Sequence, residues 1–143
     1  MPLIYGQPAN PEEFIIAKLK PLGLPVGPER NEDTPLPCYV VTAVASKSDR
    51  FLLCATVSVH TFATDTPTAM ARATASVAAW NADNLLISLT PGDTSTMSDG
   101  RHAGAWVCPI QAPMFADYRD PFIRRYVARY DVELRFRPTG IFQ

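Results

Sequence analysis

The sequence has no surplus of charge of either sign. Its 143 residues carry 13 Lys and Arg against 14 Asp and Glu, which gives a formal net charge of −1 at pH 7. A chain with this balance gains nothing from the long-range attraction to phosphate that drives non-specific binding to nucleic acids. Any nucleic-acid-binding surface would therefore have to be a local basic patch.

Cysteine motifs and long apolar runs are also missing. Cys38, Cys54 and Cys108 are widely spaced with no C-x-x-C pair, which favours reduced thiols over a disulfide framework. The N-terminus M-P-L-I-Y-G-Q-P is too short and polar for a signal peptide, and no segment approaches the roughly 20 apolar residues of a membrane helix. These absences predict a soluble protein made in a cytoplasm, with no membrane partner.

The usual signatures of catalysis and cofactor binding are absent as well. G-D-T-S-T at 92–96 lacks the lysine and the strand–loop–helix context of a phosphate-binding loop. His60 and His102 are far apart in sequence, without further ligands at metal-binding spacing. We therefore expect no catalytic residue, no metal, no cofactor and no enzymatic activity.

Proline, in contrast, is abundant. The 14 prolines are about twice the usual share of ~5%, and they leave residues 38–66 free. They mark an extended arm at 1–9 and a long connection at 21–37 around a compact centre. We expect a single domain spanning residues 1–143, long enough to bury a core.

Local patterns predict two main helices and about four strands. Asn10 as N-cap, Pro11 at the first helical position and Pro21 as terminator predict a helix at 10–20. Segments rich in β-branched and aromatic residues predict strands at 38–44, 51–62, 105–113 and 122–137. The first two strands form an antiparallel hairpin, and Pro109 indicates an edge position or a bulge in the third. The fold class is thus α+β, a mostly antiparallel sheet with two helices packed on it.

Alanine dominates the second helix, which we expect at 65–84. Met70, Ala73, Val77 and Trp80 recur at helical spacing and form one apolar face. Small residues allow close approach to a sheet or a neighbouring helix, at Ala69, Ala71, Ala75, Ala78 and Ala79. Residues 85–89 either extend this helix or form a short strand.

Two further segments, a strand and a loop, carry polar residues that we expect to contact solvent or a partner. In the strand at 51–62 the odd positions are apolar, whereas Thr56, Ser58 and His60 are polar, so one face is buried and the other faces a wetter environment. The segment 90–104 is polar and punctuated by glycine, and a loop of this length is usually functional or disordered. Its charged residues are candidates for contact with a partner, although turn formation is the favoured role of the two acids: Asp93, Asp99 and Arg101.

The last strand has the strongest periodicity of the chain. One face carries Tyr126, Ala128, Tyr130, Val132, Leu134 and Phe136. The other carries Arg125, Val127, Arg129, Asp131, Glu133, Arg135 and Arg137. Alternation of period two over about twelve residues predicts that the aromatic face belongs to the core.

Three roles remain open for the arginines of that strand, Arg125, Arg129, Arg135 and Arg137. They form a solvated face paired with the neighbouring acids, or an interface that uses arginine forks against another protein, or a nucleic-acid-binding face. The last role is disfavoured because base stacking needs aromatic and basic groups on the same surface.

The whole chain resembles the tail terminator, or tail-completion, proteins of long-tailed bacteriophages. The residues that carry the resemblance are P-x-x-F-I-I-A-K-L-K-P-L near the start, V-H-T-F at the hairpin end, the alanine-rich helix after D-T-P, and D-P-F-I-R-R-Y-V-A-R-Y-D-V-E-L-R-F-R-P near the end. The resemblance implies a structural virion protein of the tail neck, assembled in the host cytoplasm as a hexameric ring. Such a ring caps the head-proximal end of the tail tube, stops its polymerisation and offers the surface to which the head attaches.

The partners implied are further copies of the chain, the tail tube protein and the head–tail connector or stopper protein. DNA is expected to pass through the ring lumen without sequence-specific contact. Two alternatives stay open: another neck component, such as a head-completion or stopper protein, and a small α+β enzyme or ligand-binding domain.

Overall fold

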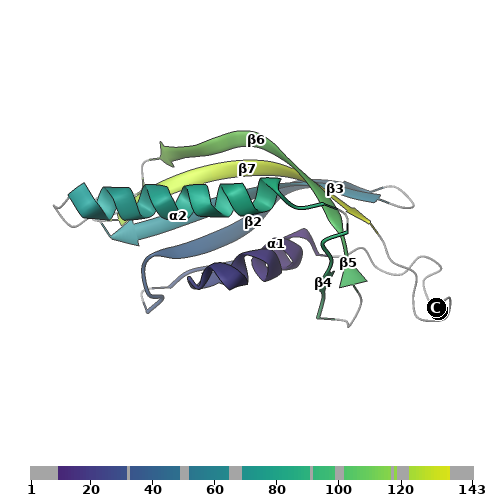
Figure 1. Cartoon of the computed structure of the whole chain (residues 1–143), viewed down its shortest axis with the longest axis horizontal. Coiled ribbons are helices and arrows are strands. Elements are labelled where there is room, and N and C mark those ends of the chain that lie inside the picture. The colour runs from purple at the N-terminus through teal and green to yellow at the C-terminus, as the bar shows by residue number, and fades with distance from the viewer. Residues whose placement is uncertain are drawn as a thin grey trace.

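A computed structural model describes residues 10–31, 33–48, 52–64, 69–90, 92–98, 102–116, 118 and 123–135, with the backbone alone at 47, 48, 52, 64, 69–74 and 135. The elements along this part of the chain (Figure 1) are α1 (Pro11–Leu19), the 3-10 helix η1 (Lys20–Leu22), β1 (Val26–Gly27), β2 (Cys38–Ser48), β3 (Leu52–Thr64), α2 (Ala69–Ile87), β4 (Ser95–Thr96), β5 (His102–Ala103), β6 (Ala105–Ala116) and β7 (Ile123–Arg135). The arm expected at 1–9 lies outside the described residues.

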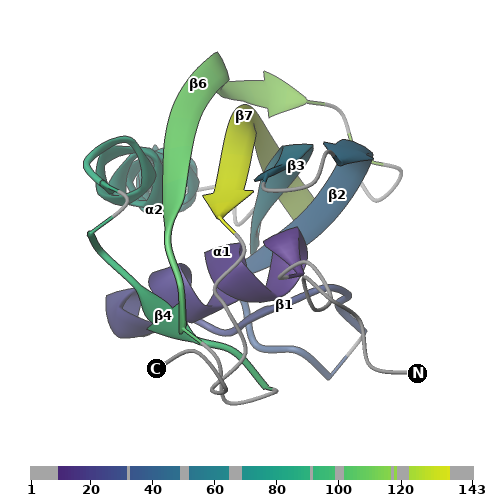
Figure 2. The ribbon, with the colours of Figure 1, turned by 90° about the vertical axis from the view of Figure 1, so that its right-hand side faces the viewer.

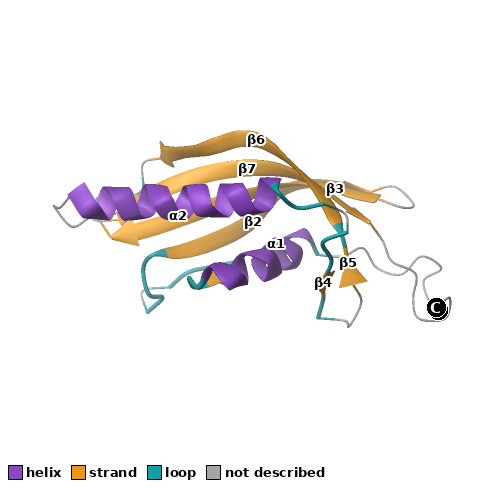
Figure 3. Cartoon of the chain, viewed as in Figure 1, coloured by secondary structure: helices purple, strands orange, loops and turns teal. Residues whose placement is uncertain are grey.

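The central element is a five-stranded sheet in the order β1-β2-β3-β7-β6. All its pairs are antiparallel except β1–β2, which is parallel. Both helices lie on one face of the sheet, which we call the inner face (Figure 2; helices are purple and strands orange in Figure 3). The predicted α+β class and the predicted hairpin are thus confirmed.

The fifth strand, β1, lies in the proline-rich connection for which no regular structure was expected. It has two residues, and the backbone N–H of Tyr39 donates to the carbonyl oxygen of Pro25 at 2.9 Å. A strand this short leaves no periodic signal in the sequence, so it forms because β2 offers a free edge.

The inner face of the sheet holds the core, and β7 shows why. Tyr130, Val132 and Leu134 are buried there, whereas the intervening residues Asp131 and Glu133 are exposed. The predicted alternation is thus confirmed for this part of the strand; nearer its start Tyr126 is half-buried and Val127 is buried, and Phe136 lies outside the described residues. The same face of β3 contributes Ala55, Val57 and Val59, and α1 covers the β2 end of the sheet with Phe14, Ile15 and Leu19.

Helix α2 packs on the sheet mainly through alanines, and Leu86 joins them near its C-terminal end. Buried positions among the described side chains of α2 are Ala75, Ala78, Ala79, Ala82, Asp83 and Leu86. Val77 and Trp80, which the sequence places on an apolar face, are 57% and 43% exposed. Alanine lets the helix backbone come close to the strands, so Val77 and Trp80 are left outside the contact.

Two buried tyrosines of the sheet bind α2 with their hydroxyl groups. The Tyr39 hydroxyl on β2 donates to the Ala78 carbonyl at 2.7 Å, and the Tyr130 hydroxyl on β7 donates to Asp83 Oδ1 at 2.7 Å. Both hydrogen bonds link the helix to the sheet. The bond from Tyr130 also explains how Asp83 can be buried in an alanine-rich interface.

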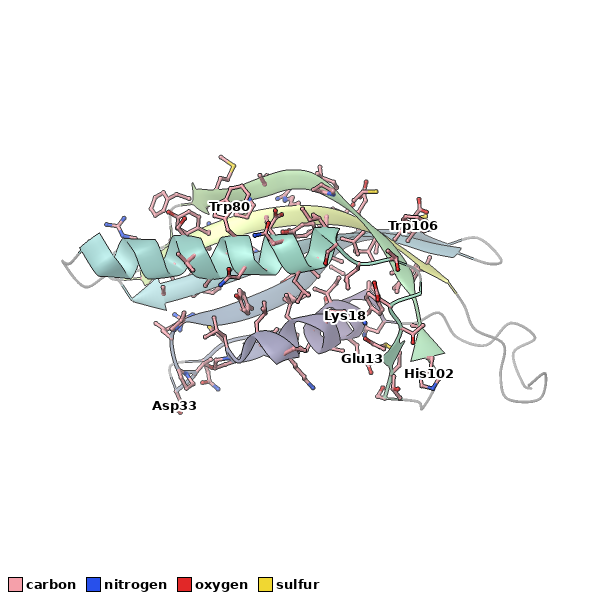
Figure 4. The ribbon with its side chains drawn as sticks, in the orientation of Figure 1. Glu13, Lys18, Asp33, Trp80, His102 and Trp106 are labelled. Atoms are coloured by element: carbon pink, nitrogen blue, oxygen red, sulfur yellow. The ribbon has the colours of Figure 1, made fainter. Side chains whose placement is uncertain are left out.

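The segment after α2 is more ordered than a polar loop. The helix continues to Ile87, so residues 85–87 extend it and form no strand. β4 and β5 then pair as a small antiparallel sheet within 90–104. Lys18 Nζ on α1 donates to the Thr94 carbonyl at 3.0 Å, and the Ser98 N–H donates to the Glu13 carboxylate. This end of the loop is thus fixed on α1, where Glu13, Lys18 and His102 lie near each other in Figure 4.

The N-cap of α1 allows a local test. Asn10 Oδ1 accepts the backbone N–H groups of Glu12 and Glu13 at 2.9 and 3.2 Å. We expect Asn10→Ala to lower the free energy of unfolding by about 1 kcal/mol, because two N–H groups lose their acceptor. Asn10→Asp keeps an acceptor and should be neutral or stabilising in the same urea titration. Equal stability of the two variants would contradict the capping role.

Candidate interaction surfaces

The arginines proposed for a partner face lie on the outer face of β7, away from the helices. Arg129 is exposed and opposite Ser58 of β3, and Arg125 is half-buried opposite Phe62. The backbone of Arg135 pairs with Leu52, but its side chain and the whole of Arg137 lie outside the described residues. The structure therefore brings two of the four arginines together on one face.

Aromatic rings share this outer face, which the sequence did not indicate. The guanidinium of Arg30 lies 5.2 Å from the ring centre of Phe62 and 5.7 Å from that of Tyr118, and the guanidinium of Arg125 lies 5.7 Å from the Tyr118 ring. Phe62 and Ser58 are buried, so the outer face of β3 is covered at this end and not wet as expected. These residues come from separate parts of the chain, so no local pattern could predict the cluster.

The cluster does not form a platform for nucleic-acid bases. Stacking needs an accessible ring face beside a cation, whereas the Phe62 ring is 6% exposed beneath Arg30. The cations and rings satisfy one another through cation–π contacts. This part of the outer face is therefore a small secondary core.

His60 sits beside the cluster and is sensitive to its charge. Its ring stacks near Phe62, with ring centres 6.2 Å apart. Burial, and then the positive charges of Arg125 and Arg129, lower the pKa of His60 below its ordinary value of 6.5. The folded protein therefore holds a neutral imidazole where the unfolded chain begins to bind a proton.

This difference in His60 pKa makes stability depend on pH. Because the folded-state pKa is the lower one, the unfolded chain binds more protons as the pH falls through 6.5, and the free energy of unfolding decreases in that range. Above pH 6.5 both states are neutral and the effect vanishes. We expect His60→Gln to remove this part of the pH dependence in urea titrations between about pH 7.5 and 5.5. An unchanged slope in His60→Gln would contradict the assignment.

Asp93 forms a turn and does not join the arginines. Its Oδ2 accepts the backbone N–H of Thr90 at 2.8 Å and the Thr90 hydroxyl at 3.1 Å, and these hydrogen bonds lower the pKa of Asp93. The turn role considered for this residue is thus observed. Asp99 and Arg101, the other candidates of this loop, lie outside the described residues.

Large exposed apolar side chains gather on α2 and the edge strand β6. Among the described residues, eight large hydrophobic side chains are exposed, and seven belong to these two elements: Val77, Trp80, Ile87, Trp106, Ile110, Met114 and Phe115. We call this set the flank. Trp80 lies on the β6 side of α2 and Trp106 lies near the start of β6 (Figure 4).

The two segments that form the flank hold no exposed charge of their own, and the charges beside it come from β7: Glu133 is paired with Trp106, and the Arg124 guanidinium lies 5.4 Å from the ring centre of Phe115. Asp83 is the only Asp, Glu, Lys or Arg in residues 75–90 and 102–116, and it is 5% exposed and bound to Tyr130. Exposed edge strands and helix faces of monomeric proteins usually carry charge, because charge prevents association. A flank of this kind is typical of a surface that another protein covers.

The edge of β6 is shaped for side-chain contact. Pro109 and Pro113 lack an N–H donor, and the pairing with β7 shifts register between Pro109 and Gln111 and again before Met114. These breaks, which confirm the edge position and bulge predicted from Pro109, interfere with the addition of a further strand. A partner would therefore pack against the side chains of the flank.

The described residues show no catalytic group in the cavity beside the sheet, no metal site and no membrane-spanning helix. A cavity of about 280 Å³ lies near the β2–β3 hairpin end and is lined among others by Cys54, Thr56, Asp131 and Glu133; its described lining holds no histidine or cation that could activate the thiol. Within the described ranges no three His, Cys, Asp or Glu side chains could hold a metal ion together. None of the helices described here is long and apolar enough to cross a membrane.

Comparison with known proteins does not add a family. No family model matches the chain, and no curated protein matches it. What the flank and the arginine face do must therefore be inferred from their geometry and chemistry, together with the resemblance noted in the sequence.

Proposed function

We propose that this chain is a structural virion protein, the tail terminator of a long-tailed bacteriophage. In this proposal six copies form a ring on the head-proximal end of the tail tube, stop its polymerisation and present the surface that joins the head. The observation that carries the proposal is the flank, a set of seven exposed large apolar side chains on two segments that hold no exposed charge of their own. Such a surface is expected on a subunit that exists in an assembly.

The remaining surfaces supply the other contacts that a neck protein needs. A ring has two open rims in addition to its subunit interfaces, one for the tube and one for the connector. The exposed Arg129, Asp131 and Glu133 of β7 offer a charged face suited to a polar, reversible contact with one of them. DNA would pass through the lumen without base contacts.

Polymerisation of the tail tube tests this function. Tube protein of the same phage is polymerised with and without the purified chain, and the products are imaged by negative-stain electron microscopy. We expect tubes grown with the chain to be shorter and to end in a ring at one end. Tubes of unchanged length with bare ends would contradict the proposal, and binding to the isolated connector in place of the tube would favour a stopper protein.

A further inference from the structure

The eighth exposed hydrophobic side chain, Val44, lies at the opposite edge of the sheet from the flank. It is 53% exposed on β2, and its exposed neighbours Thr42, Ala45 and Ser46 are uncharged. β1 pairs with β2 at Tyr39 and Val40, before this point. We propose that the Val44 edge of one copy packs against the flank of the next copy, around Ile110, in a head-to-tail contact.

The edge at Val44 and the edge at Ile110 share a local structure, a β-bulge, as well as an apolar side chain. Val44 is the residue skipped where the β2–β3 register shifts between Ala43 and Ala45, and Ile110 is the residue skipped where the β6–β7 register shifts between Pro109 and Gln111. Each is thus the extra residue of a β-bulge, and both are 53% exposed. A bulge leaves its extra residue unpaired, so each of the two strands carries one exposed apolar side chain at its bulge.

Neither edge is suited to extending the sheet by hydrogen bonds. Glu12 Oε1 on α1 accepts the outward N–H of Ala43 at 2.9 Å, and Pro109 has no N–H to offer. Strand addition is therefore blocked beside both bulges. Contact between the edges must be made by side chains, as in a packed subunit interface.

The bulges also lie at the same level along the strands. Ala43 pairs with Val57, Val57 pairs with Tyr130, and Tyr130 pairs with Pro109, so one line across the sheet joins the residues that precede Val44 and Ile110. A head-to-tail contact between patches at equal height adds no displacement along the strands from copy to copy. Repetition of such a contact is compatible with a closed ring.

Disulfide cross-linking tests this contact. In a background in which the exposed Cys54 and Cys108 are replaced by serine, we prepare Val44→Cys, Ile110→Cys and the double variant. Within one copy the two positions are three strand spacings apart, about 14 Å, which is beyond the reach of a disulfide. On oxidation with copper–phenanthroline, the double variant should form a ladder of covalent oligomers, and a mixture of the two single variants should form dimers only.

Three results would overturn the inference. A single variant that cross-links with itself would show a symmetric contact in place of a head-to-tail one. An oligomer by light scattering in which the double variant does not cross-link would exclude this interface and leave the proposed ring, on which the inference rests, intact. A protein that stays monomeric and does not cross-link, alone and when mixed with tail tubes, would exclude both. Because both positions are exposed, circular dichroism of each variant should match that of the parent protein.

Discussion

Replacing Tyr130 with phenylalanine should lower the free energy of unfolding by about 2–3 kcal/mol. The Tyr130 hydroxyl donates to Asp83 Oδ1 at 2.7 Å, and the two residues are 1% and 5% exposed. Loss of the hydroxyl leaves a buried carboxylate oxygen without its donor, which costs more than the loss of an exposed hydrogen bond. Burial and the neighbouring Asp83 raise the pKa of Tyr130, so the donor stays protonated through the accessible pH range.

Tyr126→Phe is the matched control for this change. Tyr126 lies four residues away on the same face of β7, is half-buried and packs its ring against Phe115, with ring centres 6.1 Å apart. Its hydroxyl makes no hydrogen bond to Asp83, so we expect Tyr126→Phe to lower the free energy of unfolding by less than about 0.5 kcal/mol. The double variant Tyr130→Phe/Asp83→Ala should cost less than the sum of its single changes. Urea titrations at one fixed protein concentration measure all four, since association shifts apparent stability; equal costs for Tyr130→Phe and Tyr126→Phe would contradict the buried bond.

A charge placed in either proposed contact should abolish the oligomer. Ile110→Asp or Val44→Asp would bury an unpaired carboxylate at each interface of the ring, which costs about 3–5 kcal/mol, or roughly 150-fold to 5,000-fold in affinity. Both positions are 53% exposed in a single copy, so folding should be preserved. Asn31→Asp is the control, because it adds the same charge in the exposed turn at 31–34 and keeps the Oδ1 acceptor of that turn. Light scattering measures the mass of each variant: we expect the oligomer mass for Asn31→Asp and the monomer mass for Ile110→Asp and Val44→Asp.

Mixing the two charged variants gives a sharper result. A Val44→Asp copy keeps an intact flank, and an Ile110→Asp copy keeps an intact Val44 edge, so one head-to-tail contact can form between them. We expect the mixture to yield a dimer that neither variant forms alone. Hexamers from either variant, or no dimer in the mixture of two folded proteins, would rule out the paired edges.

The elements that the sequence predicts best are those in which one pattern repeats for a long stretch. In β7 the charged and aromatic residues alternate over most of the strand, so the buried face follows from spacing alone. Helix α2 is the opposite case, since counting apolar residues gives weight to Val77 and Trp80. Close packing against a sheet favours the alanines, and the large residues are therefore left exposed.

The candidate surfaces could be predicted only in part. Arg125 and Arg129 lie on one face as period two requires, but Arg30, Phe62 and Tyr118 reach that face from three separate segments. The sequence does hold a signal for the flank, namely the lack of charge in residues 75–90 and 102–116 outside Asp83. The shared level of Val44 and Ile110 depends on strand register across the whole sheet, which spacing within one segment cannot give.

The mass of the purified protein in solution tests the central claim most directly. Light scattering coupled to size exclusion reports this mass without any partner or substrate. A ring of six copies of a 15.7 kDa chain has a mass of about 94 kDa, and we predict a discrete species at that mass that appears as a ring in negative stain. A chain that stays at 15.7 kDa, alone and when mixed with tail tubes, would contradict the account.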